Sequence, residues 1–185
     1  MIIGITGSFG SGKTTVANIF GKHGFRVIIV DELYHGIYAK DKILRRKIRK
    51  EFGTLDRAKI KKIVFNDRKR LKKLNEITHP AIIEQIKKII SNSDKKIIID
   101  APLLFEAKME RLFDRIIVVK CNKKIQIKRL FNKKKYSKKE IENIIGSQMP
   151  LKEKIRKADF VVDNNGSLND AKMQVASIAS LMQKP

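Results

Sequence analysis

An eight-residue stretch near the N-terminus combines residue types and a spacing that can bind phosphate. It reads Gly7-Ser8-Phe9-Gly10-Ser11-Gly12-Lys13-Thr14 and matches G-x-x-x-x-G-K-[ST] at every fixed position. Glycines let the backbone wrap around a phosphate and point several N–H groups inward. Lys13 can reach the β- and γ-phosphates of a nucleotide, and Thr14 offers a hydroxyl to Mg²⁺. The stretch therefore predicts a site for a nucleoside triphosphate with Mg²⁺; a glycine-rich turn with this spacing by chance is the alternative.

The segments on either side of this stretch decide between the two interpretations. Ile2 to Thr6 is a short apolar run that predicts a buried strand, and Lys13 to His23 predicts a helix that stops at Gly24. A strand, a glycine-rich loop and a helix in this order are the context of a P-loop. The predicted helix would also direct the positive end of its dipole toward the phosphates.

Two aspartates are predicted at the carboxyl ends of strands. Asp31 follows the apolar run Phe25 to Val30 and is expected to end that strand, and Asp100 ends the run Lys96 to Asp100. Ligands of open α/β sheets bind beyond these ends. Asp31 can accept a proton from an attacking hydroxyl or orient it, or it can cap the following helix. Asp100 is placed like a Walker B aspartate, which can hold Mg²⁺ through water; a loop-starting residue before Pro102 is the alternative.

A further candidate is a cation. Arg129 lies within residues 120–139, which contain ten basic and no acidic residues. In a lid, Arg129 can neutralise charge that develops on a transferring phosphoryl group; one more solvated cation is the alternative. His79 precedes Pro80 and, taken alone, caps a helix or packs in the core. The other two histidines lie at no metal-binding spacing to it, and the sequence shows no protein-only metal site.

Strands and helices alternate along the chain. Leu33 to about Ser91 predicts a long helical stretch, in which Phe52-Gly53-Thr54 ends one helix, Asp56 can cap the next and Pro80 is expected to start another. Further elements are predicted as strands at Arg115 to Val119 and Phe160 to Asp163, a helix at Asn122 to about Phe131, a helix opened by the capping-box residues Ser137 and Glu140, and a last helix with Ala171, Val175, Ile178 and Met182 on one face. This alternation predicts an α/β fold whose parallel sheet is covered on both faces. The long helical stretch suits a substrate module.

The charge of the chain is large and uneven. Lys and Arg number 42 against 19 Asp and Glu, which gives a net charge of +23. Residues 40–73 contain 16 basic and four acidic residues, a net +12, and residues 120–139 have a net +10. Such a field attracts nucleic acid or a small molecule with several phosphates, whereas a lysine-rich solvated surface is the alternative. Aromatic residues make up only 6%, with no Trp, which disfavours a platform for stacking single-stranded bases.

Length and composition bound the class of protein. The 185 residues suit one globular domain with insertions, and 42% hydrophobic residues exclude a wholly disordered chain. No apolar run approaches the roughly 20 residues that cross a bilayer, and no signal peptide is visible. Cys121 is the only cysteine, so no internal disulfide can form. The sequence therefore predicts a cytoplasmic protein that does not associate with membranes.

Several further pieces of the chain resemble, in this order, the dephospho-CoA kinase family of P-loop kinases. These pieces, together with the P-loop and its strand, are Ile5-Thr6-Gly7, Gly10 to Thr15, Val30-Asp31, Phe52-Gly53, Leu55-Asp56-Arg57, Val64-Phe65, His79-Pro80, Asp100-Ala101-Pro102-Leu103-Leu104-Phe105-Glu106, Gln126 with Arg129, Gln148-Met149-Pro150, and Ala158-Asp159 through Val162-Asp163-Asn164. Many families share the P-loop, but the Pro-Leu-Leu-Phe-Glu, His-Pro and Ala-Asp…Asp-Asn pieces are more selective. The resemblance covers nearly the whole chain.

The resemblance implies ATP-dependent phosphorylation of the ribose 3′-hydroxyl of dephospho-CoA, with ATP and Mg²⁺ as cofactors and no requirement for nucleic acid. It implies a single P-loop kinase domain over residues 1–185, with a three-layer α/β/α fold, a five-stranded parallel sheet, a helical substrate-binding insertion and a lid segment. The parts it implies are a core of about 1–32, 92–120 and 151–185, a helical CoA-binding module of about 33–91, and a lid of about 121–150.

The resemblance also implies roles for single residues. Lys13, Asp31 and Arg129 are expected to be catalytic, and Thr14 and Asp100 to hold Mg²⁺. Asp31, Arg57 and His79 are expected on the acceptor side. The residues expected to bind ATP are Gly7, Gly10, Ser11, Gly12, Lys13, Thr14, Thr15, Arg156 and Asn164, of which the last two fall at the adenine end.

The chain departs from the family pattern at four places. Ile29 stands where many members have a further Asp, His35 where an Arg is usual, Lys133-Lys134 where the lid has an Arg-Asp pair, and the loop after Phe52-Gly53 is cut to Thr54. These departures bear on acceptor and lid contacts more than on the reaction itself. The nearest alternative is a kinase of the same fold that acts on another nucleotide or a small alcohol. A nucleic-acid-binding P-loop ATPase and a nucleotide-dependent switch are further alternatives.

Overall fold

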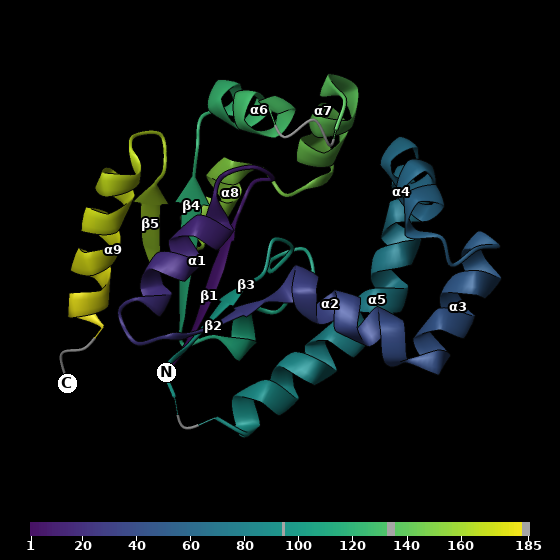
Figure 1. Ribbon diagram of the computed structural model, residues 1–185, viewed down its shortest axis with the longest axis horizontal. Helices are drawn as coiled ribbons and strands as arrows, with labels where there is room; N and C mark the ends of the chain where they lie inside the picture. Colours follow the sequence, from purple (N-terminus) through teal and green to yellow (C-terminus); the bar gives the residue numbers. More distant parts are fainter. Residues whose placement is uncertain (94, 133–135, 183–185) are drawn as a thin grey trace. The chain divides into compact units, whose positions relative to one another are not determined.

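The chain divides into two compact units. The computed structural model describes residues 1–93, 95–132 and 136–182. Met1–Ile29 and residues 94–185 form the first unit, here called the α/β unit, and Val30–Ser93 form the second, here called the helical unit. Figure 1 shows the elements of both along the chain.

The α/β unit is built on a sheet of five parallel strands in the order β2-β3-β1-β4-β5. The strands are β1 (Ile2–Gly7), β2 (Arg26–Ile29), β3 (Ile97–Asp100), β4 (Arg115–Lys120) and β5 (Phe160–Asp163). The three central strands are almost wholly buried, as expected for a parallel sheet with both faces covered. The predicted fold class is therefore confirmed.

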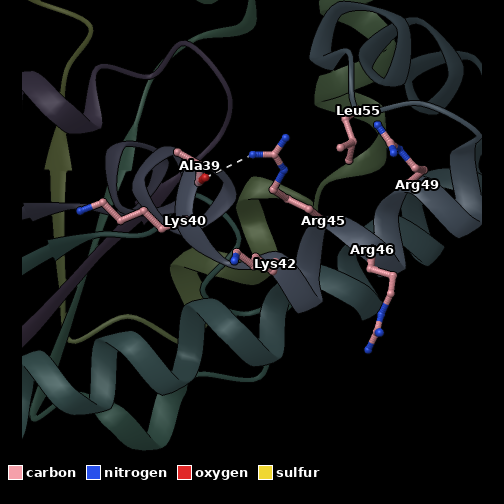
Figure 2. Close-up of a pocket in the computed structure, with 7 residues that line it drawn as sticks. All are labelled: Ala39, Lys40, Lys42, Arg45, Arg46, Arg49 and Leu55. Carbon is pink, nitrogen blue, oxygen red and sulfur yellow. Dashed lines mark hydrogen bonds between the residues drawn. The ribbon is translucent and has the colours of Figure 1, made fainter.

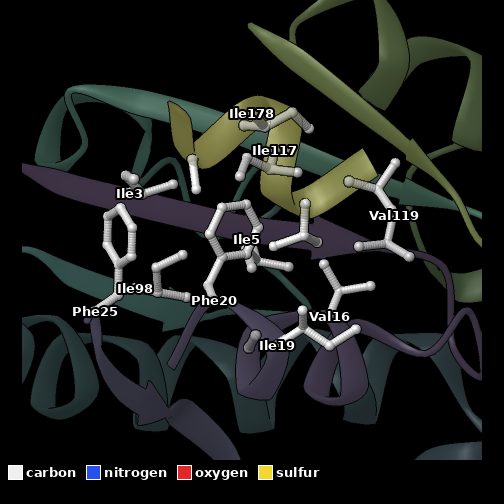
Figure 3. Packing of buried hydrophobic residues seen from close by; sticks show 14 of the residues in the cluster. Ile3, Ile5, Val16, Ile19, Phe20, Phe25, Ile98, Ile117, Val119 and Ile178 are labelled. Atoms are coloured by element: carbon white, nitrogen blue, oxygen red, sulfur yellow. The ribbon is translucent and has the colours of Figure 1, made fainter. Parts of the chain in front are cut away.

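Helices pack on both faces of this sheet (Figure 1). α1 (Lys13–Gly21) and α9 (Leu168–Leu181) pack on one face, and α8 (Leu151–Arg156) packs on the other. α6 (Lys123–Asn132) and α7 (Lys138–Ser147) lie beyond the carboxyl ends of the strands, and a 3₁₀ turn η1 (Glu110–Leu112) precedes β4. Ile3 and Ile5 of β1 point toward α1 and α9 and join them in one apolar core (Figure 3). Gly4 points the other way, where Leu104 lies against it and α8 packs on β1 and β4. The core holds the carboxyl ends of the strands in fixed register.

The helical unit consists of α2 (Val30–Lys40), α3 (Lys42–Phe52), α4 (Arg57–Asn66) and α5 (Arg68–Ser91). Asp41, Asp56 and Asp67 cap the last three, and each side chain accepts hydrogen bonds from two backbone N–H groups. Gly53 ends α3 with φ +69°, a conformation that favours glycine. The predicted break after Phe52 and the predicted cap at Asp56 are confirmed. The unit has its own apolar cluster of Tyr38, Leu44, Ile48, Phe52, Ile60 and Val64.

Two predicted boundaries are wrong. Asp31 does not end the second strand: β2 ends at Ile29, which pairs with Asp100, and Asp31 lies in the first turn of α2. The buried Val30 extends the apolar run past the strand, and periodicity alone cannot separate a strand from the first turn of a buried helix. The helix after the P-loop also ends at Gly21, two residues before the predicted His23.

Pro80 does not start a helix but lies inside α5. Proline removes one helical hydrogen bond. Apolar side chains follow the helix on both sides of it: Leu74 and Ile77 pack on the helical cluster, and Ile86 is fully buried. A continuous helix keeps both halves packed, which outweighs the missing bond.

α5 is 24 residues long, but basic residues are frequent along its first half. Among the residues that the structure describes, no helix combines the length with the apolar character that a membrane crossing requires.

Candidate active site

The glycines of the P-loop adopt conformations and close contacts that only glycine allows. Gly10 has φ +78° and Gly12 has φ +90°. A Cβ on Gly10 would lie 2.6 Å from Leu130 Cδ1, and one on Gly12 would collide with the amide nitrogen of Asn164. The sequence prediction of a tight, glycine-dependent loop between β1 and α1 is confirmed, and the loop has the shape of a phosphate cradle.

The start of α1 provides donors for an anion. No described side chain caps this helix, so its first N–H groups point out of the helix end. Lys13 is 8% exposed, and its Nζ donates to the Ser8 carbonyl at 3.2 Å. The buried hydroxyl of Ser11 has no hydrogen-bond partner among the described residues. Phosphate oxygens would satisfy these groups, so the loop fits a nucleotide.

Thr14 and Asp100 meet at the carboxyl ends of neighbouring strands. Asp100 ends β3, is 2% exposed, and accepts a hydrogen bond from the Thr14 hydroxyl at 2.6 Å. One hydroxyl and one carboxylate fit Mg²⁺, which takes few protein ligands and fills its shell with water and phosphate oxygens. Within the described ranges, no group of three or more His, Cys, Asp or Glu is arranged to hold a metal. The donor set therefore suits a metal that arrives with a nucleotide.

Asn164 and Arg129 lie against the same loop. Asn164 follows β5, is buried, and donates from its side-chain amide to the Ser11 carbonyl at 2.8 Å. Arg129 extends from α6, with its Nη1 3.8 Å from where a Cβ on Gly12 would be and 3.6 Å from the Cys121 sulfur. Burial raises the pKa of the Cys121 thiol, and the Arg129 charge opposes that rise. The structure thus brings Asn164 and a partly buried cation to the loop.

Arg156 ends α8 with an exposed side chain. Thr15 is an exposed residue in the first turn of α1. Their ATP contacts, and that of Asn164 with the adenine end, stay predictions.

The expected acceptor residues lie in the helical unit. Asp31 is exposed in the first turn of α2. Arg57 is the first residue of α4, and its Nη2 lies 3.1 Å from His35 Nε2. Because a guanidinium can only donate, the His35 nitrogen is the acceptor of this bond. Burial and the neighbouring Tyr38 raise the pKa of Tyr34 to about 12, although Arg57 opposes the rise. His79 is half-buried on α5.

A cavity of about 450 Å³ in the helical unit is surrounded by cations. Its lining residues are Ala39, Lys40, Lys42, Arg45, Arg46, Arg49 and Leu55 (Figure 2). Arg45 donates to the Ala39 carbonyl at 3.3 Å, and the Tyr38 hydroxyl donates to the Leu55 carbonyl at 2.7 Å. Within the described part of the chain, none of the five cations forms an ion pair. The cavity therefore offers uncompensated positive charge beside apolar carbon.

Sequence reasoning missed three residues that hold the loop and its surroundings. Gln148 accepts a hydrogen bond from the Phe9 backbone N–H at 2.8 Å, and the fully buried Lys154 pairs with Glu106 at 2.9 Å. The signal was present, because Glu106 and Gln148 belong to pieces on which the family resemblance rests. Their partners are distant in the sequence, so the pieces alone did not reveal a role.

The comparisons with known proteins identify the family. The family model described as dephospho-CoA kinase matches residues 1–170. The chain belongs to the dephospho-CoA kinase family. It is 41% identical to the dephospho-CoA kinase of Carboxydothermus hydrogenoformans, over 96% of this chain and 92% of that protein. TT1252 from Thermus thermophilus has a TM-score of 0.84 at 29% identity, covering 100% of this chain and 98% of that one. The dephospho-CoA kinase from Campylobacter jejuni has a TM-score of 0.69 at 28% identity, covering 98% and 96%.

As a member of the dephospho-CoA kinase family, the chain is an ATP-dependent transferase of coenzyme A biosynthesis that phosphorylates dephospho-CoA. The resemblance, the enzyme class and the reaction predicted from the sequence are confirmed. Of the departures from the family pattern, Lys133 and Lys134 lie outside the described residues, whereas His35 is placed against Arg57.

Proposed function

We propose that the chain transfers the γ-phosphoryl group of ATP directly to the ribose 3′-hydroxyl of dephospho-CoA. The observation that supports this most is the hydrogen bond between Thr14 and Asp100 at the start of α1. It joins the hydroxyl of the P-loop to a strand-end carboxylate, as a kinase that binds a metal-bound nucleotide requires. When bound, Mg²⁺ neutralises charge on the phosphates, and Thr14 and Asp100 are the residues that would hold it, directly or through water.

The α/β unit binds and polarises the donor. Backbone N–H groups of the loop and the uncapped start of α1 hold the phosphates. Lys13 and Arg129 bring positive charge to the oxygens that gain charge as the γ-phosphoryl group moves. Both cations are already positioned by contacts within the unit, Lys13 by Ser8 and Arg129 beside Gly12. Little reorganisation is then needed during transfer.

The helical unit presents the acceptor. Asp31 orients the 3′-hydroxyl and accepts its proton as the hydroxyl oxygen bonds to the γ-phosphorus and the bond to the β-phosphate oxygen breaks, which releases ADP. Arg57 and His79 are proposed to contact the acceptor, with His35 holding the Arg57 guanidinium. The cation-lined cavity is proposed to attract the diphosphate of dephospho-CoA, because charge there has no counter-ion within the described chain.

The test is to incubate the protein with ATP, Mg²⁺ and dephospho-CoA and to identify the product. One ADP should form for each product molecule that has gained a phosphate by mass and co-elutes with CoA. Co-elution is needed because a 2′-phosphate isomer has the same mass. A panel of other nucleosides, nucleotides and small alcohols should react poorly. Preferential phosphorylation of one of these, or ADP release stimulated by RNA or DNA without phosphorylated product, would contradict the proposal.

A further inference from the structure

Two motifs of the family resemblance contact each other beside the P-loop. The proposed kinase mechanism gives neither of them a role. The backbone N–H of Met149 donates to Glu106 Oε1 at 2.8 Å, although the two residues are 43 positions apart. The preceding residue, Gln148, accepts a hydrogen bond through its side-chain oxygen from the Phe9 N–H at 2.8 Å. Two consecutive residues therefore connect the segment after β3 to the P-loop.

A buried ion pair fixes the Glu106 end of this connection. Lys154 Nζ lies 2.9 Å from Glu106 Oε1, and the Lys154 side chain is fully buried. The same Nζ donates to the Pro102 carbonyl at 3.0 Å, and that carbonyl also accepts from the Thr6 hydroxyl of β1 at 3.1 Å. Desolvation offsets much of the attraction in such a pair, but removing one partner is costly. The acceptor of the Met149 N–H is thus held to the central strand and cannot easily move.

The Gln148 contact acts on one peptide plane of the P-loop. A trans peptide is planar, so its C=O and N–H point in opposite directions. The N–H of the Ser8–Phe9 peptide binds Gln148, and its C=O, that of Ser8, accepts from Lys13 Nζ at 3.2 Å and from the Ser11 N–H at 3.1 Å. Gln148 therefore binds the N–H of the same peptide whose C=O contacts the Lys13 ammonium.

The Phe9 side chain makes a second contact. Its ring packs edge-on against Tyr136, with ring centroids 5.2 Å apart. Edge-on aromatic pairs are favourable beyond the area that they bury. Phe9 is therefore held by one polar and one apolar contact.

We propose that Gln148 is a positioning residue of the P-loop, which keeps the Ser8–Phe9 peptide turned so that the Ser8 carbonyl aligns Lys13. Glu106 and Lys154 act through Met149 to hold Gln148 in place. The inference rests on the proposed binding of ATP at this loop.

The first experiment removes the contact with Gln148→Ala and follows amide hydrogen exchange in the ligand-free protein. Because a net hydrogen bond is worth about 1 kcal/mol, exchange at the Phe9 amide should accelerate about fivefold, and the Kd for ATP should rise by about the same factor. The KM for dephospho-CoA should not change. Gln85→Ala, the same change on α5 in the helical unit, is the matched control and should move none of these values.

The second experiment tests whether the ion pair acts through Gln148. Glu106→Met with Lys154→Met removes both charges and the acceptor of Met149, so it should raise the Kd for ATP as Gln148→Ala does. Adding Gln148→Ala to that background should then have little further effect. Glu106→Gln with Lys154→Met removes the same charges but keeps an acceptor for Met149, and it should retain the wild-type Kd. Melting temperatures report separately on folding.

Unchanged Phe9 exchange and unchanged ATP affinity in Gln148→Ala would overturn the inference, as would fully additive effects in the Glu106→Met, Lys154→Met background. If that background does not fold, the Phe9 exchange of Gln148→Ala still decides. A wild-type protein that binds no ATP would instead overturn the proposed donor site, and the exchange experiment would report on the contact independently of it.

Discussion

The two units differ in how the groups proposed to bind phosphate are held. In the α/β unit, three side chains at the loop have partners within the unit: Thr14 binds Asp100, Asn164 binds the Ser11 carbonyl, and Lys13 binds the Ser8 carbonyl. In the helical unit, five cations surround a cavity, and among the described residues only Arg45 of these five donates to a backbone carbonyl. Fixed charges stabilise a transition state because they need no reorganisation, whereas mobile surface charges attract a ligand. This difference supports the proposal that the first unit carries most of the chemistry and that the second captures the acceptor.

Asp31 is the exception that tests this division, because it lies in the helical unit and is proposed to take part in the chemistry. Asp31→Asn cannot accept a proton, so kcat should fall about 100- to 10,000-fold while the KM for ATP changes little. Steady-state kinetics with each substrate measures both. Glu32→Gln removes a neighbouring carboxylate on the same turn and should have a small effect. A variant with near-full turnover would exclude Asp31 from the mechanism.

Lys13→Met, in the α/β unit, should have the second-largest effect on activity. It keeps the buried stem and removes the charge, so transition-state stabilisation should fall by about 3 kcal/mol, or about 100-fold in kcat. Lys22→Met, at the other end of α1, is the control. A loss seen only in the KM for ATP would show that Lys13 contributes binding rather than catalysis, and the contrast between the units would weaken.

The separate cores can be compared directly. Ile117 in the α/β core and Ile48 in the helical cluster are both fully buried, so each change to Ala should cost about 2 to 5 kcal/mol. Hydrogen exchange should locate the damage: Ile48→Ala should accelerate exchange in α2 to α5 and leave β1, β3 and β4 protected. Equal loss of protection in the strands would show that the two units unfold as one.

Tyr34 makes the stability of the helical unit sensitive to alkaline pH. Burial raises its pKa to about 12, so the folded state favours the neutral phenol. The resulting stability is fully present below the unfolded pKa of about 10 and is lost as the pH rises toward about 12. Wild type should lose about 2 kcal/mol more than Tyr34→Phe over this range. Denaturant unfolding of both proteins at pH 9 and pH 12 measures the difference; parallel pH curves would contradict it.

The smallest effect is expected at the cavity. Arg45→Gln with Arg49→Gln should raise the KM for dephospho-CoA about threefold to tenfold, leave the KM for ATP unchanged, and reduce the salt dependence of acceptor binding. Lys22→Gln with Lys172→Gln changes the net charge equally in the α/β unit. If both pairs have the same effect, overall charge rather than the cavity attracts the acceptor.

Much of the fold followed from local sequence. The P-loop, the capping box of Ser137 and Glu140, the cap at Asp56 and the buried face of α9 are all found as predicted. Each depends on residues a few positions apart, so its physics is contained in a short window. The place of Asp31 and the course of α5 through Pro80 were mispredicted, because packing decided where the strand ended and whether the helix continued.

For the site, the sequence by itself determined the phosphate-binding loop, the reaction through the family resemblance, and the residue types available for it. Only the tertiary structure decided which groups meet. Thr14 and Asp100 are 86 positions apart, and Phe9 and Gln148 are 139 apart. No spacing rule connects such residues, because their distance is set by the register of the parallel strands and by the buried pair of Glu106 and Lys154. These long-range contacts turn a glycine-rich loop into a site of fixed shape.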